Sequence, residues 1–253
     1  MKRKSLSVTK KTLNFYLTKL KDPQVRKLYN LFSNNLASMD LTNKKIMVGV
    51  SGGADSLSVL FFSQCYSLKH KAKLHPVIID HKLRKESTIE AKNLKHKLKK
   101  NFNINCKILS KKFTKVDKNI QSYARDLRYD LFYKECKQRK IDCILLGHHK
   151  DDLIENFFIR FLRGSGLKGL VSFDKKARMN KINLFRPLLD NKKDDLIFIA
   201  KYVFNFYVKD PSNENELFQR VKIRKLIDEM QKNGLDKKKF SNTIRNLKYS
   251  DNT

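Results

Sequence analysis

The sequence predicts an α/β protein built on a doubly wound, mostly parallel sheet, with N-terminal helices before it and a short helical C-terminal tail after it. Two observations predict this class. From Lys45 onward, short apolar runs alternate with longer helix-like segments, and the short runs are almost continuously hydrophobic. Continuously apolar strands are typical of parallel sheets that are covered on both faces. Ligands of such sheets bind at the carboxyl ends of the strands, where the strand order reverses.

The elements are expected in the following order. Leucines 13, 17 and 20, followed by Val25, Leu28 and Phe32, recur at helical spacing and predict two short amphipathic helices. Strands are expected at residues 46–50, 74–80, 104–109, 142–147 and 182–185. Helices are expected at residues 55–67, 87–102, 120–139, 151–163 and 192–204, with mainly helix after about residue 210. The chain therefore divides into an N-terminal helical extension (1–44), a central domain (45–210) and a C-terminal helical tail (211–253).

The composition is strongly basic. The 253 residues carry a formal charge of +31, with a pI near 10, which favours a polyanionic partner such as nucleic acid. The abundance of lysine, with few Gly and Pro and no Trp, is also what AT-rich coding produces, so the charge supports nucleic acid without deciding it.

Cysteine spacing and hydropathy exclude several classes. The four cysteines are scattered without a C-x-x-C pair, which argues against zinc, iron–sulfur and redox-dithiol sites. No apolar run approaches the length of a membrane span. The basic first 45 residues resemble a transit peptide superficially but lack its arginine richness, so a cytosolic, reduced protein is expected.

The most informative motif is Ser51-Gly52-Gly53-Ala54-Asp55-Ser56, which directly follows the apolar run 46–50. A strand that breaks into Ser-Gly-Gly and re-enters a helix aims backbone N–H groups and a positive helix end at an anion, typically a phosphate. Asp55 is a candidate magnesium ligand against the phosphates. This is not a Walker loop, because no lysine follows the second glycine. The alternative is a glycine turn before an ordinary helix.

A second dense motif is His148-His149-Lys150-Asp151-Asp152-Leu153-Ile154-Glu155. With a helix beginning near Lys150, Asp152 and Glu155 share one helix face. We expect acid–base chemistry and binding of a cationic substrate beside the nucleotide. Acids that only complement the helix dipole are the plainer alternative, and a mononuclear metal site is a third, although adjacent histidines rarely both ligate a metal.

These motifs carry a family resemblance. The hexapeptide matches the S-G-G-x-D-S signature of the PP-loop ATP pyrophosphatases. Over about residues 45–227, the chain also resembles the tRNA(Ile)-lysidine synthetase family. Its other matching motifs are D-H-x-L-R at 80–84, A-R-x-x-R-Y at 124–129, H-H-x-D-D at 148–152, R-G-S-G-L at 163–167, R-P-L-L at 186–189, D-x-S-N at 210–213 and R-x-x-I-R at 220–224. The chain departs from the family at Lys82, where glycine is usual, and at Val221, where asparagine is usual.

The resemblance implies a ligase reaction that uses ATP and Mg²⁺. ATP would adenylate the C2 oxygen of the wobble cytidine in a CAU-anticodon tRNA(Ile) and release pyrophosphate. The ε-amine of free L-lysine would then displace AMP and leave lysidine. Family analogy also implies a homodimer, and no membrane partner is expected.

The resemblance also assigns roles to residues. The ATP-binding residues are Ser51, Gly52, Gly53, Ala54, Asp55 and Ser56, with Asp55 also holding Mg²⁺. Asp152 and Glu155 would bind the ammonium group of lysine or take its proton, and His148 or His149 would assist the departing phosphate. Arg125, Arg128 and Arg163 are candidates for contacts with ATP or RNA. The alternatives are that Arg125 and Arg128 are simply solvated on a charged helix, and that Arg163 only ends a helix before a glycine cap. The tail residues 237–239, Arg245 and Lys248 form either a tRNA-binding patch or a solvated charge run.

Three rival functions remain at this stage. A tRNA thiolase built on the same loop needs catalytic cysteines or an iron–sulfur set, and an amidotransferase-coupled synthetase is not expected to carry H-H-x-D-D or R-G-S-G-L. A non-catalytic RNA-binding remnant of the fold could lose Asp55, Asp152 or Glu155 without harm, whereas all three are present. ATP–pyrophosphate exchange discriminates among these functions.

Overall fold

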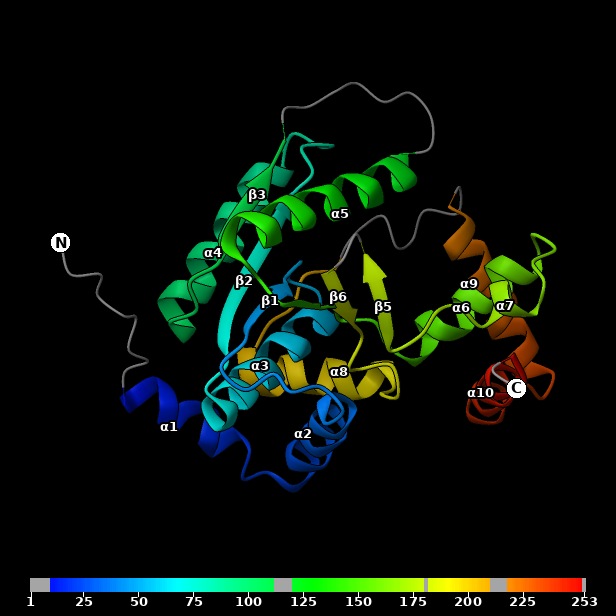
Figure 1. Cartoon of the computed structure of the whole chain (residues 1–253), viewed down its shortest axis with the longest axis horizontal. Coiled ribbons are helices and arrows are strands. Elements are labelled where there is room, and N and C mark those ends of the chain that lie inside the picture. Colours follow the sequence, from blue (N-terminus) through cyan, green and yellow to red (C-terminus); the bar gives the residue numbers. More distant parts are fainter. Residues whose placement is uncertain (1–9, 112–119, 180–181, 210–217, 252–253) are drawn as a thin grey trace.

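A six-stranded sheet forms the centre of the computed structural model, which describes residues 10–111, 120–179, 182–209 and 218–251 (Figure 1). The spatial order of the strands is β3-β2-β1-β4-β6-β5, and β5 alone of these strands runs antiparallel to its neighbour. The strands are β1 (Lys45–Gly49), β2 (Lys73–Asp80), β3 (Lys107–Ser110), β4 (Cys143–Leu145), β5 (Lys176–Met179) and β6 (Ile182–Phe185). The predicted fold class, α/β with a mostly parallel sheet, is confirmed.

The strand order reverses between β1 and β4. From β1 the chain proceeds outward through β2 to β3, then returns to the other side of β1 as β4 and continues to β6. Because β1 and β4 are parallel neighbours, the loops that follow them open into a common crevice at the carboxyl edge of the sheet. Those two loops carry the two motifs that the sequence singles out.

Helices cover both faces of the sheet and extend beyond its β5 side (Figure 1). Most of them were predicted, and α4 and α5 have the predicted bounds. The helices are α1 (Lys10–Lys19), α2 (Pro23–Leu36), α3 (Ala54–His70), α4 (Ser87–Phe102), α5 (Ile120–Arg139), α6 (Lys150–Phe161), α7 (Leu167–Leu170), α8 (Lys193–Ile199) with the π-helical turn η1 (Ala200–Phe204), α9 (Gln219–Lys232) and α10 (Lys237–Asp251).

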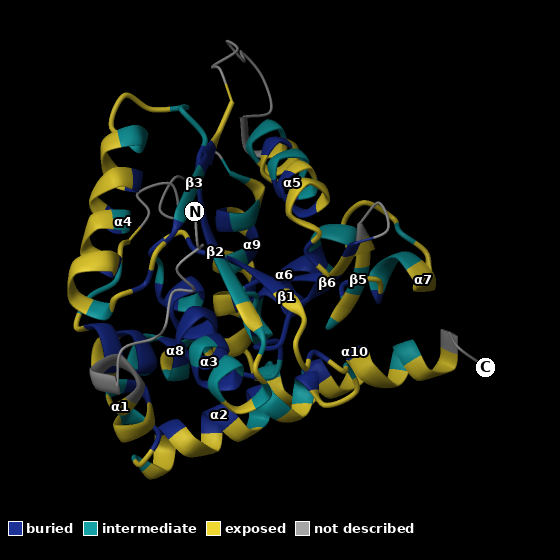
Figure 2. Cartoon of the chain, turned by 60° about the vertical axis from the view of Figure 1, so that its left-hand side comes forward, coloured by how far each residue is buried: buried dark blue, intermediate teal, exposed yellow. Residues whose placement is uncertain are grey.

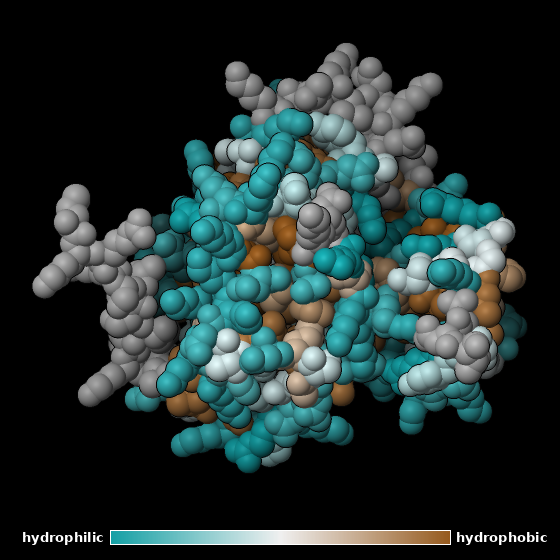
Figure 3. Space-filling view, viewed as in Figure 1, coloured by the Kyte–Doolittle hydropathy of each residue, from teal (hydrophilic) through white to brown (hydrophobic). Residues whose placement is uncertain are grey.

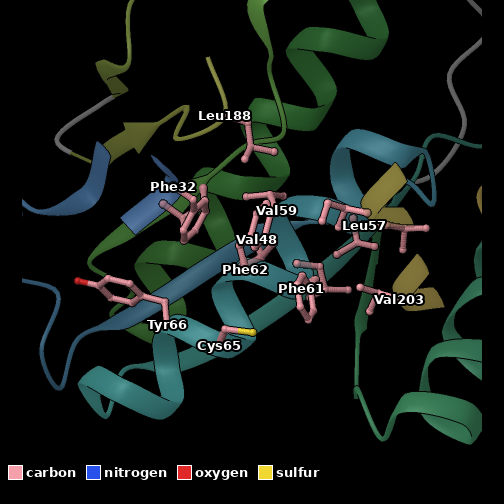
Figure 4. Packing of buried hydrophobic residues seen from close by; sticks show 14 of the residues in the cluster. Phe32, Val48, Leu57, Val59, Phe61, Phe62, Cys65, Tyr66, Leu188 and Val203 are labelled. Carbon is pink, nitrogen blue, oxygen red and sulfur yellow. The ribbon is translucent and has the colours of Figure 1, made fainter. Parts of the chain in front are cut away.

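Side chains that alternate along the strands pack into two separate hydrophobic cores, one on each face of the sheet. In β1, Ile46 and Val48 pack with α1–α4 and α8, whereas Met47 packs on the opposite face with Phe132 and Cys136 of α5. The larger core is rich in aromatic side chains and lies against α3 (Figure 4). Figure 2 shows that the central strands and the inward helix faces are mainly buried while the outward helix faces are exposed. Burial on both faces explains the continuously apolar strand sequences.

The N-terminal helices belong to the larger core. Helix α2 begins where Asp22 accepts a hydrogen bond from the backbone N–H of Val25 at 3.0 Å and Pro23 occupies the first turn. The Tyr16 hydroxyl of α1 donates to the carbonyl of Phe102 at 3.1 Å. Both helices therefore pack against the sheet domain, and the division of the chain at residues 44 and 210 stays a prediction.

The C-terminal helices form a third core with α6. Ile223 and Ile227 of α9 and Ile244 of α10 are buried against Phe158 of α6. Two tail cations also bind carboxylates of the sheet domain: Arg245 contacts Asp190 at 2.7 Å, and Lys248 contacts Asp174. Two cations of the basic tail are thus used to hold α10 in place.

Several predicted bounds were wrong for identifiable reasons. Strand β3 begins at Lys107 because Ile104 belongs to the end of α4, where its N–H bonds to the carbonyl of Leu98 at 3.1 Å after the left-handed Asn103. Strand β4 has three residues, fewer than the predicted range 142–147. Strand β5 was not predicted, because this edge strand contains Lys176 and Arg178 and lacks an apolar run. The short helix α7 was also missed.

Candidate functional site

The loop after β1 is built to approach an anion. Gly52 has φ +86°, which a residue with a side chain rarely adopts. The Ser56 hydroxyl donates to the carbonyl of Gly53 at 2.9 Å and accepts from the N–H of Ser51 at 3.1 Å, which holds the turn closed. Helix α3 begins after Gly53 without a side-chain cap, so the first turn presents its N–H groups and its positive dipole end to a ligand.

Gly147 locks this loop to the end of β4. A Cβ atom at Gly147 would lie 2.7 Å from both the carbonyl carbon and the carbonyl oxygen of Asp55, and 3.0 Å from the backbone nitrogen of Ser56. Glycine alone permits so close an approach between two backbones. The first turn of α3 and the segment leading into α6 are therefore held against each other.

The beginning of α6 combines a helix cap with the predicted acids. His149 is the N-cap: its Nδ1 accepts the N–H of Asp151 at 3.3 Å, and its own N–H donates to Asp152 Oδ2 at 2.9 Å. The other imidazole nitrogen, His149 Nε2, lies 3.8 Å from Asp55 Oδ2 and 3.6 Å from Asp152 Oδ2. The N-cap histidine thus stands between the carboxylates of the two motifs.

A cavity of about 380 Å³ opens between the sheet edge and the C-terminal helices. Its walls are Asp55 of α3, Lys193 of α8, one turn of α6 with its cap, and parts of α9 and α10. The residues of the last three elements are His149, Asp151, Asp152, Ile154, Glu155, Arg224, Ile227, Asp228 and Lys237. The structure therefore brings together Asp55, His149, Asp152 and Glu155, all of which the sequence nominated.

Three carboxylates of the cavity bind cations of this chain. Lys193 Nζ lies 2.8 Å from each oxygen of Asp55. Arg224 Nε donates to Glu155 at 2.6 Å. Lys237 Nζ lies 3.2 Å from Asp151. The cavity is thus a place where cationic groups are already bound, which is the property that an amine substrate requires.

Burial and charge set the two central carboxyl groups apart. Burial raises the pKa of Glu155 above its ordinary value, and the bond from Arg224 offsets this only in part. Burial also acts on Asp152, but the neighbouring His149, His148 and Arg220 side chains and the backbone N–H of His149 hold its pKa below the ordinary value. Glu155 is therefore the better proton acceptor, and Asp152 is the more persistent anion.

His148 has a different environment from His149. Its ring packs edge-on against Phe173, with centroids 5.4 Å apart, and its Nδ1 has no hydrogen-bond partner among the described residues. Burial, assisted by the positive charges of Arg186, Arg220 and Arg128, lowers the pKa of His148 to about 3. His148 is therefore a neutral imidazole at physiological pH and does not line the cavity.

The three predicted arginine contacts lie outside the cavity. Arg125 stacks over the ring of Tyr129 at 5.4 Å, and Arg163 donates to Gln219 at 2.8 Å. These two residues and Arg128 are exposed. Asp80, at the end of β2, is used locally, since it accepts the N–H of Lys82 and the hydroxyl of Thr88. The D-x-S-N motif at 210–213 lies outside the described residues.

Three cations that line the cavity had no role assigned from the sequence. Arg224 belongs to the R-x-x-I-R motif but had no assigned role. Lys237 belongs to the lysine run 237–239, which is expected to be either a tRNA-binding patch or solvated. Lys193 follows R-P-L-L by four positions, but one lysine among many gives no signal in so basic a chain.

The donor set fits a magnesium ion that is shared with a nucleotide. No group of three or more His, Cys, Asp and Glu side chains suited to a metal occurs among the described residues. Mg²⁺ is commonly held by one or two carboxylates together with substrate phosphates, without a complete protein cage. Asp55, in the first turn of α3, is the carboxylate placed for this role.

Fold and site together define a nucleotide-binding α/β domain with a phosphate loop at the switch point of its sheet. The family profile described as "PP-loop domain" matches residues 20–230, and this chain belongs to that family. The predicted superfamily is thereby confirmed.

Within that family, the chain is similar to tRNA(Ile)-lysidine synthases. It is 36% identical over 195 residues to that of Orientia tsutsugamushi (strain Boryong), which covers 74% of this chain and 42% of the relative. It is 33% identical over 198 residues to that of Wolbachia pipientis wMel, covering 78% and 46%. The chain thus spans less than half the length of these relatives.

A solved structure supports the fold. A U34-tRNA thiolase from Methanococcus maripaludis, determined with its [4Fe-4S] cluster, superposes with a TM-score of 0.75 at 20% identity and covers 89% of this chain and 78% of its own. Within the described residues, none of the helices is long and apolar enough to cross a membrane.

Proposed function

We propose that this chain ligates free L-lysine to C2 of the wobble cytidine of a CAU-anticodon tRNA(Ile), using ATP. One observation carries the proposal. Asp55, which directly follows the phosphate loop in the first turn of α3, lines one cavity with the acidic first turn of α6, so a nucleotide phosphate and a cationic amine can be bound side by side. The other residues of the motif, Ser51 to Ala54 and Ser56, lie next to Asp55 but do not line the cavity. The similarity to tRNA(Ile)-lysidine synthases supports it.

The phosphate loop would hold ATP for adenylation of the cytidine. The phosphates of ATP would be bound by the turn from Ser51 to Gly53 and by the uncapped first turn of α3. Mg²⁺, bound by Asp55, would neutralise phosphate charge. Because adenylation turns a poor leaving oxygen into a good one, the protein needs mainly to position the reactants and stabilise charge.

The acidic turn of α6 would handle the amine. Attack on the adenylated cytidine requires neutral lysine amine, so a proton must leave the ammonium group. Glu155 suits this step because burial raises its pKa toward the range of a general base. Asp152 suits binding of the ammonium group because its pKa is held low. His149 would assist the departing phosphate, which its position beside Asp55 and Asp152 supports.

Thiolation of tRNA is less well supported. All four cysteines are buried, and burial raises the pKa of Cys106, Cys136 and Cys143 to about 12. A thiol with so high a pKa is a poor nucleophile and a poor metal ligand at neutral pH. The structural likeness to a thiolase therefore reflects the shared fold.

The basic charge supports binding of tRNA. Figure 3 shows polar residues over most of one face, with hydrophobic residues in smaller patches. Neutralisation of several phosphates makes binding fall steeply with salt, so filter binding of tRNA at increasing KCl measures this contribution. The homodimer and the cytosolic location stay predictions.

The test is incorporation of labelled lysine into CAU-anticodon tRNA(Ile) transcript, together with tRNA-dependent ATP–pyrophosphate exchange. Asp55→Asn should abolish both reactions. Glu155→Gln should lower lysine transfer by at least about 100-fold and retain exchange, because adenylation precedes the amine step. Asp152→Asn, whose amide oxygen can still accept the N–H of His149, should also block transfer.

Asp126→Asn, on the exposed surface of α5, is the matched control and should behave as wild type. Wild-type protein that catalyses exchange without lysine transfer would point to a different acceptor amine. Protein that binds tRNA without any exchange would favour the RNA-binding remnant and overturn the proposal.

A further inference from the structure

Lys193 occupies an unusual position beside the phosphate loop. It extends from the first turn of α8, and its ammonium group contacts both carboxylate oxygens of Asp55 at 2.8 Å. Both side chains line the cavity, with Lys193 40% and Asp55 25% exposed. A lysine of this chain therefore holds the carboxylate that the proposed function assigns to Mg²⁺.

Stability is a poor explanation for this contact. A salt bridge with one partner 40% exposed contributes little to folding, and α8 is already anchored by buried Leu196 and Ile199. The Ser58 hydroxyl of α3 also donates to the carbonyl of Leu196 at 3.0 Å, so α3 and α8 are joined without the ion pair. The lysine is available for another task.

Two cations cannot share the oxygens of Asp55 without strong repulsion. A Mg²⁺ ion binds carboxylate oxygens at about 2.0–2.1 Å, so a metal bound to Asp55 would lie directly next to the ammonium group of Lys193. Arrival of the metal must therefore displace Lys193 from the carboxylate. The phosphates that arrive with the metal carry several negative charges, and the uncapped end of α3 places them beside Asp55. Lysine is a charge on a flexible four-carbon stem, which allows such a transfer.

We propose that Lys193 is a phosphate ligand for ATP, held by Asp55 in the nucleotide-free protein and transferred to a phosphate oxygen when Mg²⁺ takes the carboxylate. The inference rests on the proposed use of ATP and Mg²⁺ at this site. It assigns Lys193 a direct contact with the substrate that pairs with the metal contact of Asp55.

The experiment compares Lys193→Met, which keeps the length of the side chain, with Lys193→Arg and the control Lys192→Met. Lys192 is the adjacent exposed residue. Equilibrium dialysis measures binding of ATP with Mg²⁺, and the electron paramagnetic resonance of free Mn²⁺ measures binding of that metal without nucleotide.

Opposite changes are expected from the single substitution Lys193→Met. ATP binding should weaken by about 10- to 100-fold because a charged hydrogen bond is lost. Mn²⁺ alone should bind about threefold to tenfold more tightly, because the competing ammonium group is gone. Lys193→Arg should retain ATP binding, and Lys192→Met should change neither quantity.

Unchanged ATP binding in Lys193→Met would overturn the proposal. Parallel weakening of ATP and Mn²⁺ would overturn it too, because it would show that Lys193 only props up Asp55. Lysine transfer is measured separately on the wild type. Opposite shifts in ATP and Mn²⁺ binding by a protein that transfers no lysine would support this inference while rejecting the proposed function.

Discussion

Replacing Gly147 by alanine would force apart the two segments that form the site. The added Cβ would lie 2.7 Å from the carbonyl atoms of Asp55, and these are backbone atoms that cannot rotate away. Carbon atoms pack best at about 3.5–4.0 Å, so the end of β4 and the first turn of α3 must separate by about 1 Å.

The displacement has two expected consequences. Overpacking of this kind costs about 1–3 kcal/mol of unfolding free energy. For a chain of this length, about 2 kcal/mol corresponds to a fall of about 4–8 °C in Tm. Because the shifted turn carries Asp55 and the phosphate-facing N–H groups, a displacement of about 1 Å should lower catalytic efficiency by about 100-fold.

Urea unfolding and ATP–pyrophosphate exchange measure the two effects on the same preparations. Gly166→Ala is the control, since a Cβ there meets no atom within 4 Å and its φ is −66°. A Gly147→Ala protein that unfolds at the wild-type urea concentration and retains wild-type exchange would refute the argument that this close approach positions the loop.

Three further outcomes follow from contacts elsewhere. Asp190→Asn should cost about 2 kcal/mol at pH 7, because Lys175 and Arg245 lose their carboxylate partner. Burial would raise the pKa of Asp190, yet Lys175, Asn35 and Arg245 together hold it below the ordinary 3.8. The stabilisation from this carboxylate is therefore present above pH 3.8 and is lost on further acidification. Urea unfolding curves of the wild type and Asp190→Asn should converge at acid pH. Lys82→Gly should raise the unfolding free energy by up to about 1 kcal/mol, and Tm slightly, because Lys82 has φ +54°. An unchanged or lower Tm would contradict this. The four buried cysteines should react with an aromatic disulfide reagent at pH 8 only after unfolding, and rapid labelling of the native protein would contradict their burial.

The sequence predicted the parts of this protein that follow from local rules. Helices α4 and α5 have the expected bounds because their apolar spacing is regular and their ends are marked. The phosphate loop and the acidic turn of α6 were recognised because special backbone and cap geometry restrict residue choice. The meeting of Asp55, Asp152 and Glu155 was expected because parallel strands end at one edge of the sheet.

The rest of the site depends on long-range packing. Arg224 reaches Glu155 because α9 packs on α6 through Ile223 and Ile227, and no local pattern fixes that docking. Lys193 is one lysine in a lysine-rich chain, and its pairing with Asp55 arises from the packing of α8 on α3. The two histidines differ because the ring of His148 packs edge-on against Phe173, whereas His149 caps α6. Lys82, where the resemblance leads one to expect glycine, has φ +54°, a left-handed backbone that favours glycine.

The ion pair between Lys237 and Asp151 makes the C-terminal helix a tethered competitor for amines. An ammonium group attached to the chain acts at a high effective concentration, of the order of millimolar or more, at any carboxylate within its reach. A free amine that uses Asp151 must displace Lys237, so its apparent affinity falls by the fraction of time that the lysine is bound. The docking of α10 therefore raises the concentration of free amine that is needed to occupy Asp151.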